Sequence, residues 1–121
     1  WTIIKQIKEK IKIPVIANGD VRSYNDGLLL LKKTRSDLVM IGREAQHCPW
    51  VFHEKPVDIK QQILRFIDLY EQYELRQSPV EVADHVFWML RDFTTTEDTK
   101  KVHLITTIPR IKRYVNRLSS R

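Results

Sequence analysis

Residues 13–20 read Ile13-Pro14-Val15-Ile16-Ala17-Asn18-Gly19-Asp20, and residues 37–43 read Asp37-Leu38-Val39-Met40-Ile41-Gly42-Arg43. In each stretch a short run of mostly branched apolar side chains precedes a glycine and a polar residue. Such runs predict strands that are buried on both faces, as in parallel sheets. The glycine after each run predicts a turn. We therefore expect two buried parallel strands over 13–17 and 37–41, each ending at a glycine loop.

Helical patterns precede and separate these two strands. Thr2 is expected to cap a first helix, and Ser23 with Asp26 resembles a capping box in front of the leucines at 28–31. Alternation of helix, strand and glycine turn is typical of parallel α/β architecture. Two strands do not make a stable sheet by themselves. We therefore expect the remaining strands to come from sequence outside these residues or from another chain.

From Pro56 onward the pattern is helical and contains no glycine. One helix is expected over 59–70, and Ser78-Pro79-Val80-Glu81 is a full capping box for a second. Residues 95–98 are expected to open a third helix that Pro109 interrupts, and a basic amphipathic helix follows. The predicted fold class is α/β followed by all-α, with a C-terminal helical bundle. The apolar positions of the last two helices are Val102, Leu104, Ile105 and Ile108, then Ile111, Tyr114, Val115 and Leu118.

Positive charge is concentrated at the carboxyl end of the chain. There are 21 Lys and Arg against 15 Asp and Glu, which gives a net charge of +6. No acidic residue follows Asp98. An excess confined to one segment indicates a basic face for a polyanion, and a solvated helix that only keeps the protein in solution is the alternative. The basic residues of this segment are Lys100, Lys101, Arg110, Lys112, Arg113, Arg117 and Arg121.

Length and composition exclude several classes of protein. A chain of 121 residues suits one domain or parts of two, and not a complete large barrel enzyme. The apolar fraction of 42% and the mean hydropathy of −0.38 exclude disorder, and no apolar run approaches the roughly 20 residues of a membrane span. A single cysteine excludes an intrachain disulfide and favours a cytoplasmic location. No signal peptide is expected, and a start at Trp1 in place of Met predicts the end of a longer protein.

Polar residues and glycines follow both predicted strands. Asn18, Gly19 and Asp20 follow the first, and Gly42 and Arg43 follow the second. Ligands in parallel α/β folds bind beyond the carboxyl ends of the strands, where glycine lets the backbone approach a phosphate. An arginine adds a charge-assisted contact. The two loops therefore predict a phosphate-binding site, and the alternative is that both glycines only form turns.

The strings IPVIANGDV and DLVMIGREA, followed by CPWVF, resemble the tRNA-dihydrouridine synthase family. The resemblance covers about residues 1–52, including Trp1 ahead of the first helix. It continues into the helical half, where His85 and Trp88 are similar to the family's Arg-Lys-His and Trp signature. The chain differs from the family pattern at Glu44, where the family has glycine.

The resemblance implies an FMN-containing TIM (β/α)8 barrel joined to a C-terminal helical tRNA-binding domain. Such enzymes reduce the C5–C6 bond of uridine in tRNA, and NADPH reduces the flavin. By this resemblance residues 1–54 are the last two βα units of the barrel and residues 55–121 are the helical domain; the partners are tRNA and the missing part of the barrel. The residues matching the flavin-phosphate loops are Asn18, Gly19, Asp20, Gly42 and Arg43. The residues expected to contact RNA are His85, Lys112, Arg113 and Arg117.

No catalytic residue is expected in this chain. The resemblance implies a cysteine general acid in an Asn-x-Gly-Cys-Pro context, which the sequence does not contain. Cys48-Pro49 has the dipeptide but follows the second glycine loop, so we do not assign it that role. The four histidines lack metal-ligand spacing with Cys48, and no metal site is predicted. We therefore expect the 121-residue chain to be inactive by itself.

Two other functions stay open. A non-enzymatic RNA-binding remnant fits, because the chain lacks the general acid and the contacts to the flavin ring. Another FMN-dependent barrel oxidoreductase would share the glycine loops, but the basic helical half argues against a small-molecule enzyme. Visible flavin absorbance and salt-dependent tRNA binding separate these hypotheses.

Overall fold

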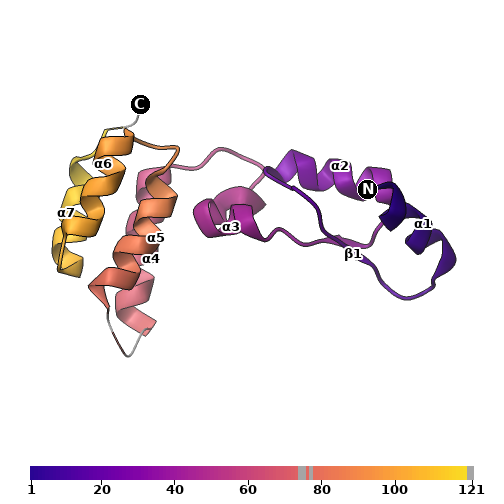
Figure 1. Cartoon of the computed structure of the whole chain (residues 1–121), viewed down its shortest axis with the longest axis horizontal. Coiled ribbons are helices and arrows are strands. Elements are labelled where there is room, and N and C mark those ends of the chain that lie inside the picture. Colours follow the sequence, from indigo (N-terminus) through magenta and orange to yellow (C-terminus); the bar gives the residue numbers. More distant parts are fainter. Residues whose placement is uncertain (74–75, 77, 120–121) are drawn as a thin grey trace. The chain divides into compact units, whose positions relative to one another are not determined.

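The computed structural model describes residues 1–73, 76 and 78–119, and the chain divides into two compact units, Trp1–Pro56 and Val57–Arg121 (Figure 1). The first unit contains helices and two short strands, and the second contains helices in its described residues. The predicted order of α/β followed by all-α sequence is confirmed in this coarse form. The assignment of 1–54 to a flavin barrel and of 55–121 to a tRNA-binding domain stays a prediction.

The first unit has the predicted alternation of helix and strand. Strands β1 (Ile16–Ala17) and β2 (Leu38–Val39) pair in parallel, with Ile16 opposite Leu38 and Ala17 opposite Val39. Both strands are shorter than the predicted 13–17 and 37–41. The helices and the 3-10 segment of this unit are α1 (Thr2–Lys10), α2 (Tyr24–Thr34), α3 (Arg43–His47) and η1 (Pro49–Phe52).

Local capping explains where α2 begins. The Ser23 hydroxyl accepts a hydrogen bond from the Asp26 N–H at 3.1 Å, and the Asp26 carboxylate accepts one from the Arg22 N–H at 3.2 Å. The predicted capping role of Ser23 is confirmed. The prediction that Thr2 caps α1 is wrong, because Trp1 occupies the N-cap position and Thr2 is already helical.

One face of the short sheet carries the core of the first unit. Ala17, Val21 and Leu30 are buried there, and α2 contacts both strands. Full burial of a side chain such as Leu30 contributes about 1.5–3 kcal/mol. The predicted burial of both sheet faces is wrong for this chain, since Ile16 and Leu38 are 60% and 58% exposed. The reason is that no element among the described residues covers the second face.

An ion-pair cluster joins α1 to the starts of both strands. The Asp37 carboxylate accepts hydrogen bonds from the Lys8 ammonium and from the Val15 N–H, each at 2.6 Å. The Lys8 hydrogen bond, followed by that of Val15, lowers the pKa of Asp37 below its ordinary value. The carboxylate therefore fixes the entry of the chain into β1 next to the start of β2.

The second unit packs four helices around one apolar core. Helix α5 (Pro79–Leu90) contacts α4 (Ile59–Tyr73), α6 (Thr96–Lys101) and α7 (Ile108–Arg117), and α4 also contacts α7 (Figure 1). The 3-10 segment η2 (Val102–Leu104) packs against α5. The fully buried side chains at the centre are Ile63, Ile67, Val82, Val86, Leu90, Val102, Ile111 and Val115.

The helix starts predicted at Ser78 and Thr95 are confirmed, whereas the predicted end of the third helix and the predicted break at Pro109 are wrong. Ser78 and Thr95 cap α5 and α6 through their hydroxyl groups. Pro109 does not interrupt the third helix but lies in the first turn of α7, where its missing N–H costs nothing. The third helix already ends at Lys101, and Leu104, which was expected on its apolar face, is 79% exposed.

A tyrosine connects α4 to the start of α5. The Tyr70 hydroxyl donates to the Glu81 carboxylate at 2.7 Å and accepts from the Ser78 N–H at 3.2 Å. In a capping box the glutamate would bind the Ser78 N–H directly. Here the hydroxyl relays that bond, so the cap of α5 also holds α4.

Candidate functional site

The parallel pairing of β1 and β2 brings the two glycine loops to the same edge of the sheet. The Met40 N–H donates to the Ala17 carbonyl at 2.8 Å, so the pairing extends to the ends of the strands. Gly19 and Gly42 follow these ends, and among the described residues other than its chain neighbours, none has a heavy atom within 4 Å of the position that a Cβ on Gly42 would take. The loops are therefore adjacent, and Gly42 is open to an approaching group.

Two of the predicted site residues contact each other across the loops. An Arg43 Nη atom lies 2.5 Å from an Asp20 carboxylate oxygen, and the side chains are 85% and 71% exposed. An exposed ion pair of this kind is worth about 0.2–1 kcal/mol. The Arg43 guanidinium is therefore accessible to solvent and only weakly held by Asp20.

The backbone of the first loop has an uncommon conformation. Gly19 has φ +148°, and Asp20 has φ +49° in the left-handed region, which non-glycine residues seldom adopt. Within the described residues, the N–H groups of Gly19, Asp20, Gly42 and Arg43 make no hydrogen bond. Backbone N–H groups without a protein partner can bind an anion directly. Asn18, the remaining predicted residue, is exposed beside them.

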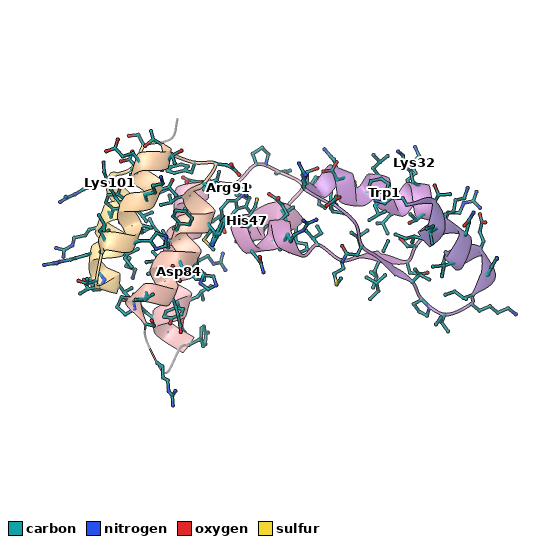
Figure 2. The ribbon with its side chains drawn as sticks, viewed as in Figure 1. Trp1, Lys32, His47, Asp84, Arg91 and Lys101 are labelled. Carbon is teal, nitrogen blue, oxygen red and sulfur yellow. The ribbon has the colours of Figure 1, made fainter. Side chains whose placement is uncertain are left out.

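Trp1 is a site residue that the sequence pattern did not predict. Its indole N–H donates to the Gly19 carbonyl at 3.1 Å, and the Lys33 ammonium lies 5.4 Å from the centre of its ring. Figure 2 shows Trp1 between the start of α1 and the end of α2. The sequence placed Trp1 ahead of the first helix, but no local signal connects it to a loop 18 residues later.

One side of helix α7 is buried in the core, and a lysine next to it forms ion pairs with α4. Ile111 and Val115 are buried, while the Lys112 ammonium lies between Asp68 and Glu71 of α4, at 2.5 and 2.6 Å. The hydrogen bond with Asp68, followed by that with Glu71, raises the pKa of Lys112. The structure therefore places one predicted RNA contact, Lys112, in the joint between two helices.

The arginines of α7 lie on its exposed face. Arg110, Arg113 and Arg117 are exposed, and the described part of the chain gives them no ion pair. Their spacing of three and four residues puts them on one side of the helix. Arg110 lies on this exposed face although it was not among the residues predicted to contact RNA.

His85, the other predicted RNA contact, lies on α5. Its Nδ1 is 2.9 Å from the Glu81 carbonyl, and its ring centre is 5.4 Å from that of Phe66. The residue is exposed, and its Nδ1 carries the proton if it donates to that carbonyl. A second histidine of this unit, His103, pairs with Asp84 at 3.2 Å.

A family model described as "Dihydrouridine synthase (Dus)" matches residues 1–106, which is most of the chain. The chain belongs to the dihydrouridine synthase family. The resemblance inferred from the glycine loops is thereby confirmed. The two loops and the helices up to η2 all lie within the matched residues.

Curated relatives of this chain are named tRNA-dihydrouridine synthase B. The relative from Vibrio parahaemolyticus is 33% identical over 113 residues, covering 81% of this chain and 35% of the relative. That from Shewanella oneidensis is 37% identical over 98 residues, covering 81% and 27%. That from Xanthomonas axonopodis is 48% identical over 54 residues, covering 45% and 16%. The chain thus spans about a third or less of the length of these relatives.

Three further observations concern Cys48, metal binding and membrane spans. Cys48 is half-buried at the carboxyl end of α3, and its N–H donates to the Glu44 carbonyl at 2.8 Å. Among the described residues no three His, Cys, Asp or Glu side chains are placed to bind one metal ion. In that same part of the chain, no helix is long and apolar enough to cross a membrane.

Proposed function

We propose that this chain is the C-terminal part of a tRNA-dihydrouridine synthase. In this proposal residues 1–54 complete an FMN-binding TIM (β/α)8 barrel, and residues 55–121 form a helical bundle that binds tRNA. The whole enzyme reduces the C5–C6 bond of uridine in tRNA, with FMN and NADPH. The observation that carries the proposal is the pair of glycine loops at one sheet edge, with unpaired N–H groups beside Arg43, in a chain of the dihydrouridine synthase family.

The residues at the strand ends suit an anionic phosphate group. The N–H groups of Gly19, Asp20, Gly42 and Arg43 supply donors, and the exposed guanidinium supplies positive charge. Asn18 adds an amide next to them. These five residues would hold the phosphate of FMN, and the bound flavin supplies the hydride chemistry while NADPH supplies the electrons. The chain's own part in the reaction is therefore to anchor the cofactor.

The basic face of α7 suits the phosphate backbone of tRNA. Arg113 and Arg117 are exposed as such contacts require, and Arg110 extends the same face. Lys112, which its carboxylate partners neutralise, contributes to the helix joint in this proposal. His85 lies on α5 and is a second, separate candidate for an RNA contact.

A non-enzymatic RNA-binding protein is the second candidate function. The observation in its favour is that the sequence contains no Asn-x-Gly-Cys-Pro motif, so the expected general acid is absent from these 121 residues. In that case tRNA binding would persist in a protein that never takes up flavin. The two functions therefore differ in flavin content.

A chimera tests the proposed enzyme function. In the Vibrio parahaemolyticus tRNA-dihydrouridine synthase B, the segment that matches this chain is replaced by residues 1–121, and the chimera is produced in cells that lack dihydrouridine synthases. We expect the purified chimera to contain FMN, and mass spectrometry to detect dihydrouridine in the tRNA of these cells.

Two variants of the chimera test whether its FMN content depends on Arg43. Arg43→Ala should lower the FMN content, because it removes the charged contact to the phosphate. Lys32→Ala, which removes one positive charge from the exposed part of α2, should leave the FMN content unchanged. A folded chimera that contains no flavin and makes no dihydrouridine would contradict the proposal.

A further inference from the structure

Trp1 reaches from the start of α1 to the loop that follows β1. Its indole N–H donates to the Gly19 carbonyl at 3.1 Å, and a Cβ on Gly19 would lie only 3.3 Å from the indole nitrogen. The ring itself is held by α2, where the Lys33 ammonium lies 5.4 Å from its centre. The indole therefore joins two helices to one peptide group of the loop.

That peptide group has a second polar end. The Gly19 carbonyl and the Asp20 N–H belong to the same planar trans peptide, so they point in opposite directions. Fixing the carbonyl against the indole directs the Asp20 N–H away from Trp1. Within the described residues this N–H makes no hydrogen bond. The contact with Trp1 thus orients a donor that the loop itself does not use.

The conformation of Asp20 needs support of this kind. Its φ of +49° is uncommon for a residue with a side chain, so the loop is held by contacts at both of its sides. Trp1 binds the Gly19 carbonyl on one side, and Arg43 binds the Asp20 carboxylate on the other. A phosphate that takes Arg43 away from Asp20 would leave the indole as the contact that keeps the loop in place.

We propose that Trp1 is a positioning residue for the phosphate site: its indole N–H holds the Gly19–Asp20 peptide so that the Asp20 N–H faces the anion. This inference rests on the proposed flavin-phosphate site. It adds a residue to that site that never touches the phosphate and acts through one backbone carbonyl.

The experiment is an NMR titration of the 121-residue chain with inorganic phosphate at constant ionic strength. In the unaltered chain the amides of Gly19, Asp20, Gly42 and Arg43 should shift together. The indole N–H of Trp1 should shift with the same apparent Kd, because a hydrogen bond at one end of a peptide polarises the other. The indole N–H signals of Trp50 and Trp88 should not follow that curve.

Trp1→Phe keeps the ring and removes the donor. We expect the apparent Kd for phosphate to rise about three- to tenfold, the effect of losing one hydrogen bond. The response of the Asp20 amide should weaken more than that of Gly42, whereas a purely structural role would weaken both equally. Trp50→Phe, the same change elsewhere in the first unit, should leave the titration unchanged.

The outcomes separate this inference from the function on which it rests. If no amide of the unaltered chain responds to phosphate, both the phosphate site and the role of Trp1 are overturned. If the amides respond but the Trp1 indole N–H does not, only the role of Trp1 is overturned, and this measurement needs no variant to fold. A Trp1→Phe chain that binds phosphate as tightly as the unaltered chain overturns it as well.

Discussion

At the scale of single residues, Gly19 and Asp20 show how the site depends on backbone conformation. Both have positive φ, and two side chains from outside their loop contact them: Trp1 binds the Gly19 carbonyl, and Arg43 binds the Asp20 carboxylate. A phosphate site made of backbone N–H groups requires such a fixed loop, because its donors have no side-chain rotamers with which to adjust. We therefore expect glycine at position 19 to be required by the fold and by the proposed phosphate site.

Replacing Gly19 by alanine should destabilise the first unit. The φ of +148° disfavours any side chain, and the new Cβ would meet the Trp1 indole at 3.3 Å. We expect a loss of about 1–3 kcal/mol in the free energy of unfolding, measured by urea denaturation. Gly27→Ala is the matched control, because its Cβ would make an ordinary contact at 3.8 Å within α2. Gly27→Ala should raise the free energy of unfolding by about 0.5–1 kcal/mol. Equal effects of Gly19→Ala and Gly27→Ala would contradict the claim that the backbone at Gly19 requires glycine.

Lys112 should contribute to stability and not to RNA affinity. Lys112→Met removes the charge between Asp68 and Glu71 and keeps an apolar stem. We therefore expect the free energy of unfolding at neutral pH to fall by about 1 kcal/mol. Because its pKa is raised in the folded state, this contribution is complete below the ordinary pKa of 10.5 and is lost as the pH rises through the folded value. Urea denaturation between pH 7 and strongly alkaline pH measures the difference between the two chains.

The stability difference between unaltered and Lys112→Met chains should therefore shrink at alkaline pH. Lys32→Met, at an exposed position of α2, should show no such difference at any pH. A constant difference across the pH range would mean that packing of the lysine stem, and not its charge, joins α4 to α7.

At the scale of elements, α7 separates the side chains that pack from the arginines that are proposed to bind tRNA. Its apolar side faces the core, Lys112 joins it to α4, and the Tyr114 hydroxyl donates to the Asp98 carbonyl at 2.9 Å at the start of α6. Arg110, Arg113 and Arg117 lie on the remaining side of the helix, which is exposed to solvent. A helix fixed on three sides presents the fourth at a defined angle, which a flexible basic tail cannot do.

The slope of log K against log salt for tRNA tests the arginine face. Arg110→Ala, Arg113→Ala and Arg117→Ala should each lower the steepness by about one unit, the effect of one lost phosphate contact. Lys112→Met should leave the slope unchanged, and Lys32→Ala is the control for a lost charge in the first unit. An unchanged slope in all three arginine variants would exclude α7 from the RNA surface.

The starts of several helices could be predicted from local sequence. The burial of the strand residues could not, because it depends on elements that are distant in the sequence. Ser23, Ser78 and Thr95 were identified as caps because a capping bond joins residues three positions apart. The exposure of Ile16 and Leu38 was not predictable, because an apolar run does not reveal whether both faces of its strand have partners.

The candidate site was predicted only in part for the same reason. The glycine loops follow from strand order, whereas the Asp20–Arg43 and Trp1–Gly19 contacts join residues 23 and 18 positions apart. Such contacts depend on how the strands pair and not on sequence spacing. The same holds for Lys112, whose carboxylate partners lie on another helix.

At the scale of the whole molecule, the first unit carries one covered and one uncovered sheet face. In the proposed function its two strands supply a site for the phosphate of FMN, but a flavin ring needs further walls that two strands do not offer. We therefore expect the isolated 121-residue chain to show no stoichiometric flavin absorbance after incubation with FMN and gel filtration, and no uridine reduction. Stoichiometric bound flavin in this chain would contradict that expectation.

The most direct measurement compares the affinities of FMN and riboflavin for the chimera described above. Riboflavin lacks the phosphate, so the ratio of the two Kd values isolates the contribution of the phosphate site. We predict that FMN binds at least about tenfold more tightly than riboflavin, and that Arg43→Ala reduces this ratio through a loss confined to FMN. Equal affinities for FMN and riboflavin, or a ratio that Arg43→Ala leaves unchanged, would contradict the claim that the glycine loops and Arg43 hold the phosphate of the flavin.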